Sequence, residues 1–438
     1  MNFDYKNILI MGYGKSGVAV EEVVKKLNVE YKIYDAGKGV SGGNYYCKLN
    51  RNIISQFDLI VVSPGISIYN KYVVMAEKMG IKVVGELEFG YWFTGSPIIA
   101  VTGTNGKTTT TQLITSITSS TYKCDAYGNI GKPLSLAYKD DNNYLVCEVS
   151  SFQLESTNSF LPYISIILNI AEDHIDRHKT FENYIKCKMG LLKNCTEKSL
   201  IILNADDEII MKRSETIKAK KYYISKFNKV KGVYIHKEKI YVNVNGKSKE
   251  ILSLDDIPNF NGIIDDVLAS ILVGVLLKID NDKIIECVKS FKVSHHRLEV
   301  IAKKNGVTYI NDSKSTNVHS SLNALSVTSG DIVLLLGGGD KNLNFDEIFR
   351  KYKDKLKFVV AFGDARKKVM KCANKFKFEN IKMFKSFYDG VKFACEYAKE
   401  NDVVLLSPAC TSFDEFTSYS ERGEVFEKLV KEYDYAKN

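Results

Sequence analysis

Patterns typical of membrane proteins and of disulfide-rich secreted proteins are missing from this chain. The nine cysteines among its 438 residues are scattered and form no Cys-x-x-Cys pair, so we expect free thiols. Six prolines are too few for a proline-rich linker or stalk. No apolar run reaches the roughly 18 residues of a spanning helix, and the N-terminus lacks the pattern of a signal peptide. We therefore expect a cytoplasmic protein.

Positive charge is in excess but is not concentrated. Lysine and arginine outnumber aspartate and glutamate by 61 to 52, which gives a net charge of +9. No block of five or more basic residues occurs, so solvated helix faces and an anionic small-molecule substrate account for the charge. We expect no nucleic-acid partner, no membrane contact and a monomer.

Length and hydrophobic pattern predict three α/β domains. At about 150 residues per domain the length suggests three, and 45% hydrophobic with 26% charged residues is typical of globular proteins. A predicted strand at 7–11, helix at 17–27 and strand at 31–34 begin an alternation that is typical of βαβ units with parallel sheets. The alternation restarts at residue 98 and near residue 298. We place the domains at residues 1–93, 94–293 and 294–438.

The remaining strands follow from short apolar runs. A hairpin at 233–244 is expected to interrupt the central alternation. Further strands are predicted at 59–62, 81–84, 98–101, 144–147, 164–168, 307–310, 332–336, 358–361 and 403–406.

A Gly-x-Gly-x-x-Gly string at 12–17 follows the first strand and opens a helix. Its glycines allow a tight turn, and the helix N-terminus favours a phosphate. Asp35 ends the next strand, where an acid can bind a ribose hydroxyl. NAD is the literal interpretation, but the strand pattern stops near residue 84, after about half a dinucleotide fold. A mononucleotide or a nucleotide-sugar pyrophosphate therefore fits better, and a simple tight turn stays open as the alternative.

The string GTNGKT at 103–108 lies between a predicted strand and a predicted helix at 109–117, which is the context of a P-loop. Successive backbone N–H groups form an anion nest there. Lys107 would reach the β- and γ-phosphates, and the Thr108 hydroxyl would bind Mg²⁺. Val101 stands where the strict motif has its first glycine, but GKT after a buried strand remains specific.

Two acidic strings follow the next strands of the central domain. Glu148 comes directly after the strand at 144–147, at the strand end where an acid can hold Mg²⁺ beside a P-loop. The string at 169–178 combines His174 with several carboxylates and resembles no zinc signature, so it suits a second Mg²⁺ or an anionic substrate. His178 alone is expected to be a surface residue.

Three polar loops follow strands of the C-terminal third, at 311–317, 337–341 and 407–413. They are rich in Ser, Thr, Lys and Gly. Open α/β sheets bind ligands beyond the carboxyl ends of their strands, so we expect the three loops to form one binding face. Cys410 is disfavoured as a nucleophile because no histidine lies near it in the sequence.

Taken together, these motifs resemble the Mur ligase family, the ATP-dependent amide ligases of peptidoglycan precursor synthesis. The resemblance spans essentially the whole chain. It rests on SPGI at 63–66, GTNGKT at 103–108, EVSSFQLE at 148–155, DSKSTN at 312–317 and SPACTSFDEF at 407–416. Asn105 stands where the alanine-adding member has histidine, and the DNPR-like string of the diamino-acid-adding member is absent. Folylpolyglutamate synthase shares the P-loop and the lysine site but has no N-terminal nucleotide-sugar domain.

The resemblance implies the fold and the reaction. A Rossmann-like domain at 1–93 would bind the UDP substrate, a central P-loop ATPase domain would bind ATP, and a C-terminal Rossmann-like domain at 294–438 would bind the amino acid. The reaction would add D-glutamate to UDP-N-acetylmuramoyl-L-alanine through an acyl phosphate, releasing ADP and phosphate.

The resemblance also implies the site residues. The catalytic residues would be Lys107, Glu148, His174 and Lys188. Two Mg²⁺ ions would be held by Thr108 and Glu148 and by His174 and carbamylated Lys188. ATP would contact Gly103, Thr104, Asn105, Gly106, Lys107, Thr108, Thr109, Arg297 and Asp312. The UDP substrate would contact Lys15, Ser16, Asp35, Gly65, Asn129 and His174, and D-glutamate would contact Lys314, Thr316, Lys341, Ser412, Phe413 and Tyr419.

Two departures and two rival functions stay open. The segment 261–266 stands where the family has the HN..N string that holds adenine, and Ala36-Gly37 follows Asp35 where the family tends to have Thr-Arg. The adenine and uracil contacts are therefore left open. A nucleotide-sensing module that has lost turnover is one rival, and an NAD-dependent oxidoreductase based on 12–17 is the other.

Overall fold

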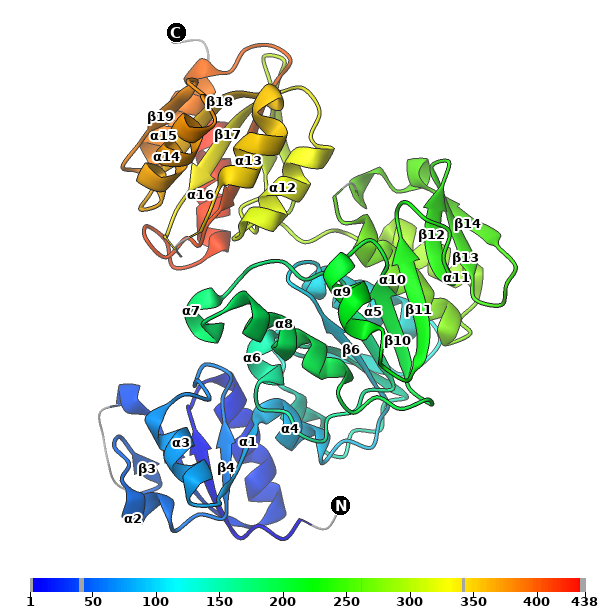
Figure 1. Cartoon of the computed structure of the whole chain (residues 1–438), viewed down its shortest axis with the longest axis vertical. Coiled ribbons are helices and arrows are strands. Elements are labelled where there is room, and N and C mark those ends of the chain that lie inside the picture. Colours follow the sequence, from blue (N-terminus) through cyan, green and yellow to red (C-terminus); the bar gives the residue numbers. More distant parts are fainter. Residues whose placement is uncertain (1–2, 39–42, 261, 341–342, 434–438) are drawn as a thin grey trace. The chain divides into compact units, whose positions relative to one another are not determined.

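The computed structural model describes residues 3–38, 43–260, 262–340 and 343–433 (Figure 1). The chain divides into two compact units, which we call unit 1 and unit 2. Unit 1 comprises Met1–Pro258 and Ile263–Phe291, and unit 2 comprises Asn259–Gly262 and Lys292–Asn438. All nine cysteines are free thiols, as expected. Among the described residues no helix is both long and apolar enough to cross a membrane.

Unit 1 begins with a five-stranded parallel sheet in the order β3-β2-β1-β4-β5. Apolar runs bury its middle strands: Ile8 and Ile10 of β1 pack with Val20 and Val24 of the first helix. The strands are β1 Asn7–Met11, β2 Glu30–Tyr34, β3 Tyr45–Tyr46, β4 Leu59–Val62 and β5 Lys82–Gly85. The helices are α1 Lys15–Leu27, α2 Arg51–Ile54, α3 Lys71–Lys78 and α4 Glu86–Tyr91.

The second sheet of unit 1 has nine strands in the order β14-β13-β12-β11-β10-β9-β6-β8-β7. Strands β6 to β12 pair in parallel, and β12, β13 and β14 pair antiparallel. The strands are β6 Ile98–Thr102, β7 Cys124–Gly128, β8 Tyr144–Glu148, β9 Ile164–Ile167, β10 Leu200–Asn204, β11 Lys220–Ser225, β12 Gly232–His236, β13 Lys239–Asn243 and β14 Lys249–Ser253. The predicted hairpin is confirmed, and β14 extends it by one strand.

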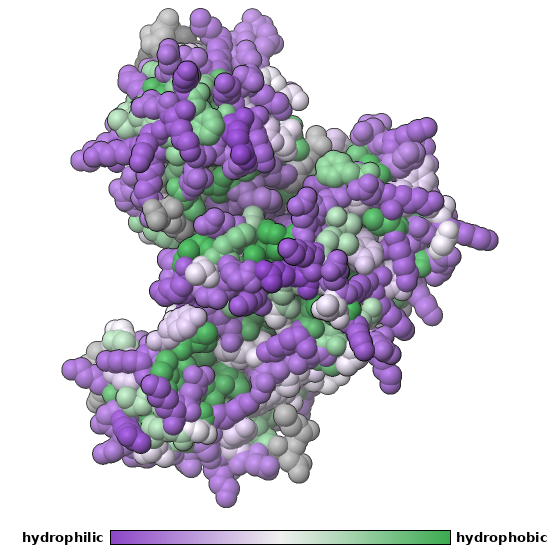
Figure 2. All heavy atoms as spheres, viewed as in Figure 1, coloured by the Kyte–Doolittle hydropathy of each residue, from purple (hydrophilic) through white to green (hydrophobic). Residues whose placement is uncertain are grey.

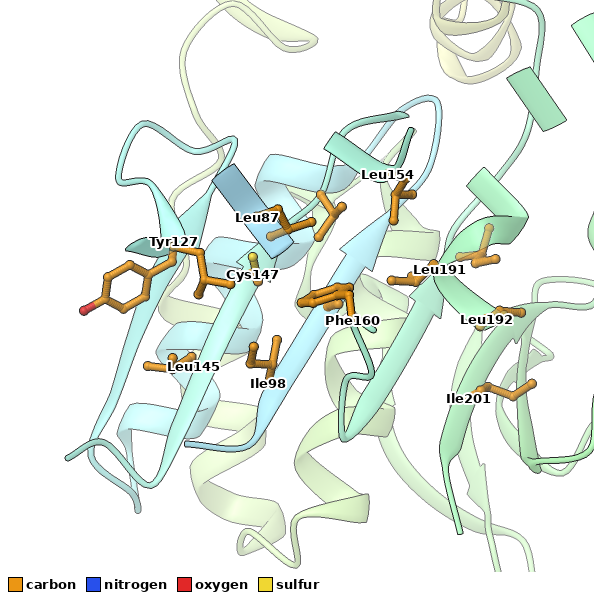
Figure 3. Close-up of a cluster of buried hydrophobic side chains, with 14 of the residues drawn as sticks. Leu87, Ile98, Tyr127, Leu145, Cys147, Leu154, Phe160, Leu191, Leu192 and Ile201 are labelled. Carbon is orange, nitrogen blue, oxygen red and sulfur yellow. The ribbon is translucent and has the colours of Figure 1, made fainter. Parts of the chain in front are cut away.

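Helices cover this second sheet. They are α5 Lys107–Ser119, α6 Ser151–Leu154, α7 Ile175–His178, α8 Phe181–Met189, α9 Glu208–Ser214, α10 Ile264–Leu276 and α11 Asn281–Ser290. Figure 3 shows an apolar cluster on one face of this sheet. In this cluster Ile98 of β6 and Cys147 of β8 lie near Leu87 of α4 and near Phe160. This core fixes the strand ends that carry the predicted site.

Unit 2 is built on a six-stranded sheet in the order β15-β16-β20-β17-β18-β19. Its strands are parallel except β15, which pairs antiparallel with β16. They are β15 Glu299–Lys304, β16 Val307–Asn311, β17 Asp331–Gly337, β18 Leu356–Phe362, β19 Ile381–Met383 and β20 Asp402–Ala409. The helices are α12 Val318–Val327, α13 Asp346–Tyr352, α14 Arg366–Lys375, α15 Phe387–Tyr397 and α16 Tyr419–Glu432.

Hydrophobic clusters fill both faces of the sheet in unit 2. Leu334 and Leu336 face one cluster, and Val333 and Leu335 face the other, as period-two alternation along β17 requires. On the face of unit 2 that Figure 2 shows, polar side chains predominate. The ends of β16, β17 and β20 therefore rest on a packed core.

Candidate active site

The P-loop joins the buried strand β6 to helix α5. Gly106 is the residue before the helix and has φ +86°, in the left-handed region that favours glycine. A Cβ there would lie 2.1 Å from the carboxylate oxygen Oδ1 of Asp266. Glycine is therefore required both by the backbone conformation and by the close approach of α10.

The segment after β9 holds the P-loop in place. Asn169 accepts the amide of Thr104 on its carbonyl at 2.9 Å and the amide of Asn105 on its side-chain oxygen at 2.8 Å. The Thr104 hydroxyl accepts the amide of Ala171 at 2.9 Å and lies 3.0 Å from the Tyr184 hydroxyl. These bonds fix the loop before any ligand binds, and the motif at 103–108 gave no sign of Asn169 as a partner.

Two lysine amines lie against the carbonyl side of this loop. Lys107 donates to the carbonyls of Gly103 and Thr104, both at 2.9 Å. Lys188, on α8, donates to the Gly103 carbonyl at 2.7 Å and lies over the Tyr184 ring. The structure therefore brings together two of the predicted catalytic residues, which are 81 positions apart in the sequence.

Lys188 is 1% exposed. Burial lowers the pKa of its amine well below the usual value, and the positive charge of Lys107 lowers it further, while Asp173 and Glu148 oppose the shift. A buried amine with a low pKa is often neutral and nucleophilic at physiological pH. The acidic side chains that act on Lys188 include Glu148, the third predicted catalytic residue.

Glu148 ends β8 and is 2% exposed. Its Oε1 accepts a hydrogen bond from the Asn129 side chain at 2.8 Å. Among the described residues its Oε2 has no hydrogen-bond partner, although it is buried. A buried carboxylate oxygen without a donor costs free energy unless a cation or a water satisfies it.

His174 lies directly before α7 in a left-handed conformation, with φ +54°. Its Nε2 is 3.7 Å from a carboxylate oxygen of Asp173, and its ring meets Phe152 edge to face at 4.8 Å between centroids. The side chain is 38% exposed, so it can reach a ligand. Thr108 is half-buried in the first turn of α5, whereas Thr109 is buried.

The expectation for His178 is wrong. Its side chain is 1% exposed, with Nδ1 3.1 Å from Glu155 and Nε2 3.0 Å from the Ser151 hydroxyl. Glu155 also binds Arg177 through two hydrogen bonds, of 3.1 and 2.7 Å. His178 is thus buried against Glu155, which lies 23 residues earlier in the sequence and outside the string at 169–178.

Arg177 also reaches the first sheet of unit 1. It donates to the carbonyl of Ile66 at 3.0 Å and to that of Gly65 at 3.4 Å. Gly65 belongs to the string SPGI and is exposed. No role was predicted for Arg177, although it lies inside the histidine-containing string at 169–178.

The glycine-rich turn at 12–17 is a tight strand-to-helix connection. A Cβ at Gly17 would lie 2.1 Å from the Gly12 carbonyl oxygen, so the turn requires glycine. Asp35 accepts the amides of Tyr13 and Gly37, both at 2.9 Å. Lys15 is exposed and Ser16 is half-buried in the first turn of α1, so both are accessible to a ligand.

The first turn of α10 lies against the P-loop. Asp265 forms an ion pair with Lys226 at 2.9 Å, and Asp266 lies against Gly106. The first turn of α10 is therefore acidic and borders the loop that is assigned to phosphate.

In unit 2, Asp312 lies directly after β16 and is 2% exposed. Burial raises the pKa of its carboxyl to about 6, although hydrogen bonds from Ser315 and Ser407 and the charge of Arg297 act in the opposite direction. The two hydroxyls donate at 2.5 and 2.8 Å. Two of the three polar loops thus meet at this carboxyl.

The residues assigned to D-glutamate differ in exposure. Lys314 donates to the Ser294 hydroxyl at 3.3 Å and its amine lies 5.9 Å from the centre of the Tyr419 ring. Ser412 is buried, Thr316 is half-buried, and Phe413 is 74% exposed. Lys341 lies outside the described residues.

Three models of Mur ligase domains match the chain. The MurD-like N-terminal domain matches residues 6–85, the Mur ligase middle domain matches 101–263, and the glutamate ligase domain matches 296–410. Together they cover most of the chain.

Similar proteins agree with these matches. A UDP-N-acetylmuramoylalanine–D-glutamate ligase of Thermoanaerobacter sp. is 37% identical over 452 residues, 99% of each chain. A protein of the same name from Clostridioides difficile is 35% identical, over 98% of this chain and 99% of its own.

Solved structures show the same fold. A pseudomurein peptide ligase type C from Methanothermus fervidus has a TM-score of 0.61 at 18% identity and covers 97% of this chain and all of its own. MurF ligase from Thermotoga maritima, in complex with ADP, has a TM-score of 0.59 at 17% identity and covers 98% and 96%. The expected three-domain α/β fold, with Rossmann-like terminal domains and a central P-loop domain, is confirmed, and the chain belongs to the Mur ligase family.

Proposed function

We propose that this protein is the ligase that adds D-glutamate to UDP-N-acetylmuramoyl-L-alanine, with cleavage of ATP to ADP and phosphate, in peptidoglycan precursor synthesis in the cytoplasm. The full-length similarity to ligases of that name supports the substrates. The observation that carries the proposal is that Lys107 and Lys188 both bind carbonyls of one P-loop, while Glu148 pairs with Val101 at the end of the strand that leads into this loop.

The chemistry requires an activated carboxylate, because a free carboxylate is not electrophilic toward an amine. The terminal carboxylate of the UDP substrate attacks the γ-phosphate of ATP and ADP leaves, which gives an acyl phosphate. The amine of D-glutamate then attacks the acyl carbon, the amide forms and phosphate leaves. Such transfers depend on positioning and on neutralisation of phosphate charge.

Lys107 would supply positive charge to the transferred phosphoryl group. Its amine now donates to two loop carbonyls, so it is held at the loop and can turn toward a bound phosphate. The N–H groups of residues 103–108 and the first turn of α5 would bind the remaining phosphate oxygens. Arg297 and Asp312 would add further contacts to ATP.

The residues present fit two Mg²⁺ ions. Glu148 offers an oxygen that has no hydrogen-bond partner among the described residues, and Thr108 and His174 are accessible. Glu148 and Thr108 would hold one ion, and His174 and carbamylated Lys188 the other. Bound Mg²⁺ would neutralise charge on the phosphate oxygens.

Lys188 suits carbamylation, because only a neutral amine adds to CO₂ and burial lowers the pKa of this amine. The carbamate would replace a cation by an anionic oxygen ligand. The charge of Lys107 beside it would stabilise that anion.

The other two substrates would bind through residues outside the P-loop. Lys15, Ser16, Asp35, Gly65, Asn129 and His174 would hold the UDP substrate. Lys314, Thr316, Lys341, Ser412, Phe413 and Tyr419 would hold D-glutamate. Donors on lysine and serine suit two carboxylates better than an apolar side chain.

A panel of amino acids tests the proposal. Phosphate release is measured with ATP, Mg²⁺ and UDP-N-acetylmuramoyl-L-alanine, and with D-glutamate, L-glutamate or D-alanine as the amine. We expect release only when D-glutamate is the amine. D-alanine lacks the side-chain carboxylate, and a site built to bind that group rejects such a ligand by a factor on the order of 10⁴. L-glutamate keeps both carboxylates but cannot place its amine and both acids together. Efficient release with D-alanine or L-glutamate would contradict the substrate assignment, and no release with any amine would favour a nucleotide-sensing module.

A further inference from the structure

Arg422, in the first turn of α16, is the largest fully buried side chain of the described residues. Its guanidinium makes four hydrogen bonds with two of the three polar loops. Nε donates to the Ser313 hydroxyl at 3.0 Å and Nη2 to the Ser313 carbonyl at 2.9 Å. Nη2 also donates to the Cys410 carbonyl at 3.1 Å, and Nη1 to the Thr411 carbonyl at 3.0 Å.

The third polar loop lies beside the same guanidinium. A Cβ on Gly338 would lie 3.0 Å from Nη1 of Arg422, and Gly338 has φ +129°. The Thr411 carbonyl, which Arg422 binds, also accepts the amide of Gly339 at 2.9 Å. Arg422 therefore binds the loops that follow β16 and β20, and the loop that follows β17 is joined to them through the Thr411 carbonyl.

Arg422 has no carboxylate within ion-pair distance among the described residues, and its acceptors are the Ser313 hydroxyl and the backbone carbonyls of Ser313, Cys410 and Thr411. Burial lowers the pKa of the guanidinium to about 10, so it remains charged at neutral pH. The carboxylates of Asp414 and Asp312 act in the opposite direction and favour the charged guanidinium.

We propose that Arg422 is a positioning residue for the amino-acid substrate: it fixes the Ser313–Lys314 and Thr411–Ser412 segments so that their donors face one dicarboxylate. The inference rests on the proposed function and deepens it. Each segment has one residue on the guanidinium, Ser313 or Thr411, and its next residue, Lys314 or Ser412, is assigned to D-glutamate. Loss of the guanidinium would remove the hydrogen bonds that fix the two segments, so Lys314 and Ser412 could move apart.

The test compares Arg422→Lys and Arg422→Met with Lys304→Met. Lys304 is the matched control, because it is also a cation that donates to backbone carbonyls at α16, those of Val430 and Lys431, both at 2.8 Å. It lies at the other end of the helix from the polar loops. The KM values for D-glutamate, ATP and the UDP substrate and the Tm are measured for each variant.

We expect Arg422→Met to raise the KM for D-glutamate about tenfold or more, with the other two KM values within about twofold, since small misplacements of binding groups cost heavily. Arg422→Lys keeps the charge but not the fork of donors, so its KM for D-glutamate should lie in between. Lys304→Met should lower the Tm without changing the KM for D-glutamate.

A second variant keeps the proposal testable if Arg422→Met does not fold. Ser313→Ala removes the acceptor of Nε, and its effect on the KM for D-glutamate should not multiply with that of Arg422→Lys, because the two residues share one contact. An unchanged KM for D-glutamate in Arg422→Lys, or an equal rise of all three KM values, would overturn the role. A wild-type protein that releases no phosphate with D-glutamate would overturn the proposed function as well, whereas an active wild type with unchanged variants overturns only the role of Arg422.

Discussion

Each unit buries one cationic side chain beneath a loop that we assign to a substrate, and the two cations differ in kind. In unit 1, Lys188 donates to the P-loop carbonyl of Gly103. In unit 2, Arg422 donates to carbonyls of the loops after β16 and β20. Burial lowers the pKa of both, well below the usual value for Lys188 but only to about 10 for Arg422.

The difference follows from the chemistry of the two groups. A lysine amine loses its proton readily when it is desolvated and can then react, whereas a guanidinium stays charged and presents a rigid fork of donors. Lysine therefore suits a position that takes part in chemistry, and arginine suits one that holds loops. Under the proposed function, phosphoryl transfer would take place at the centre in unit 1, and the amine would bind at the face in unit 2.

The largest effect should follow removal of the P-loop charge. Lys107→Ala is expected to lower the rate of phosphate release about a thousandfold with the fold intact, because one charge on the transferred group contributes several kcal/mol. Release is measured with all three substrates, and the Tm reports the fold. Near-normal release in Lys107→Ala would remove the P-loop from the mechanism.

Lys188→Ala should lower the rate about a hundredfold or more, with partial rescue by added short carboxylic acids that replace the carbamate oxygens. Lys193→Ala is the matched control, since Lys193 is a lysine of the same unit that donates to the Thr157 carbonyl and whose pKa is also lowered by burial. Full activity of Lys188→Ala, or equal losses in both variants, would contradict a chemical role for Lys188.

In unit 2 the expected effect is on KM. Lys341→Ala should raise the KM for D-glutamate about tenfold and leave that for ATP nearly unchanged, because a carboxylate loses a charged partner. Steady-state kinetics with each substrate varied in turn measures both values. An unchanged KM for D-glutamate would show that Lys341 is misassigned.

The smallest effect concerns stability against pH. The pKa of the Asp312 carboxyl is about 6 in the folded protein, whereas the ordinary value of an aspartate is 3.8. Between about pH 4 and 6 the unfolded chain releases this proton while the folded protein keeps it, so Asp312 makes folding less favourable as pH rises, by on the order of 2–3 kcal/mol. The Tm of wild type should therefore fall relative to that of Asp312→Asn across this range. A constant Tm difference from pH 4 to 8 would show that Asp312 is ionised throughout.

Long apolar strands and glycine-rich loops could be predicted from the sequence. The predicted bounds 7–11 and 59–62 are the same as those of β1 and β4. Continuous apolar runs are typical of strands that are buried on both faces. Strands β3 and β19, of two and three residues, gave no such signal. The antiparallel strand β15 is half exposed along most of its length, so alternation of strand and helix did not reveal its direction.

The site was predictable only where its residues lie in one string. The string GTNGKT predicted the P-loop. The residues that hydrogen-bond to this loop, Asn169 and Tyr184, lie 64 or more positions away in the sequence. Arg422 is 109 residues from Ser313 and was missed. Arg422 lies four residues before Phe426 and eight before Val430, on the buried face of α16. This helical spacing was the one feature of the sequence that indicated a buried arginine.

Trapping of the acyl phosphate tests the division between the units most directly. ATP and the UDP substrate are mixed without D-glutamate, and borohydride reduces any acyl phosphate to an alcohol that mass spectrometry detects. We predict that Arg422→Lys yields about as much alcohol as wild type and that Lys107→Ala yields almost none. A loss of the trapped product in Arg422→Lys, or its normal formation in Lys107→Ala, would contradict the account.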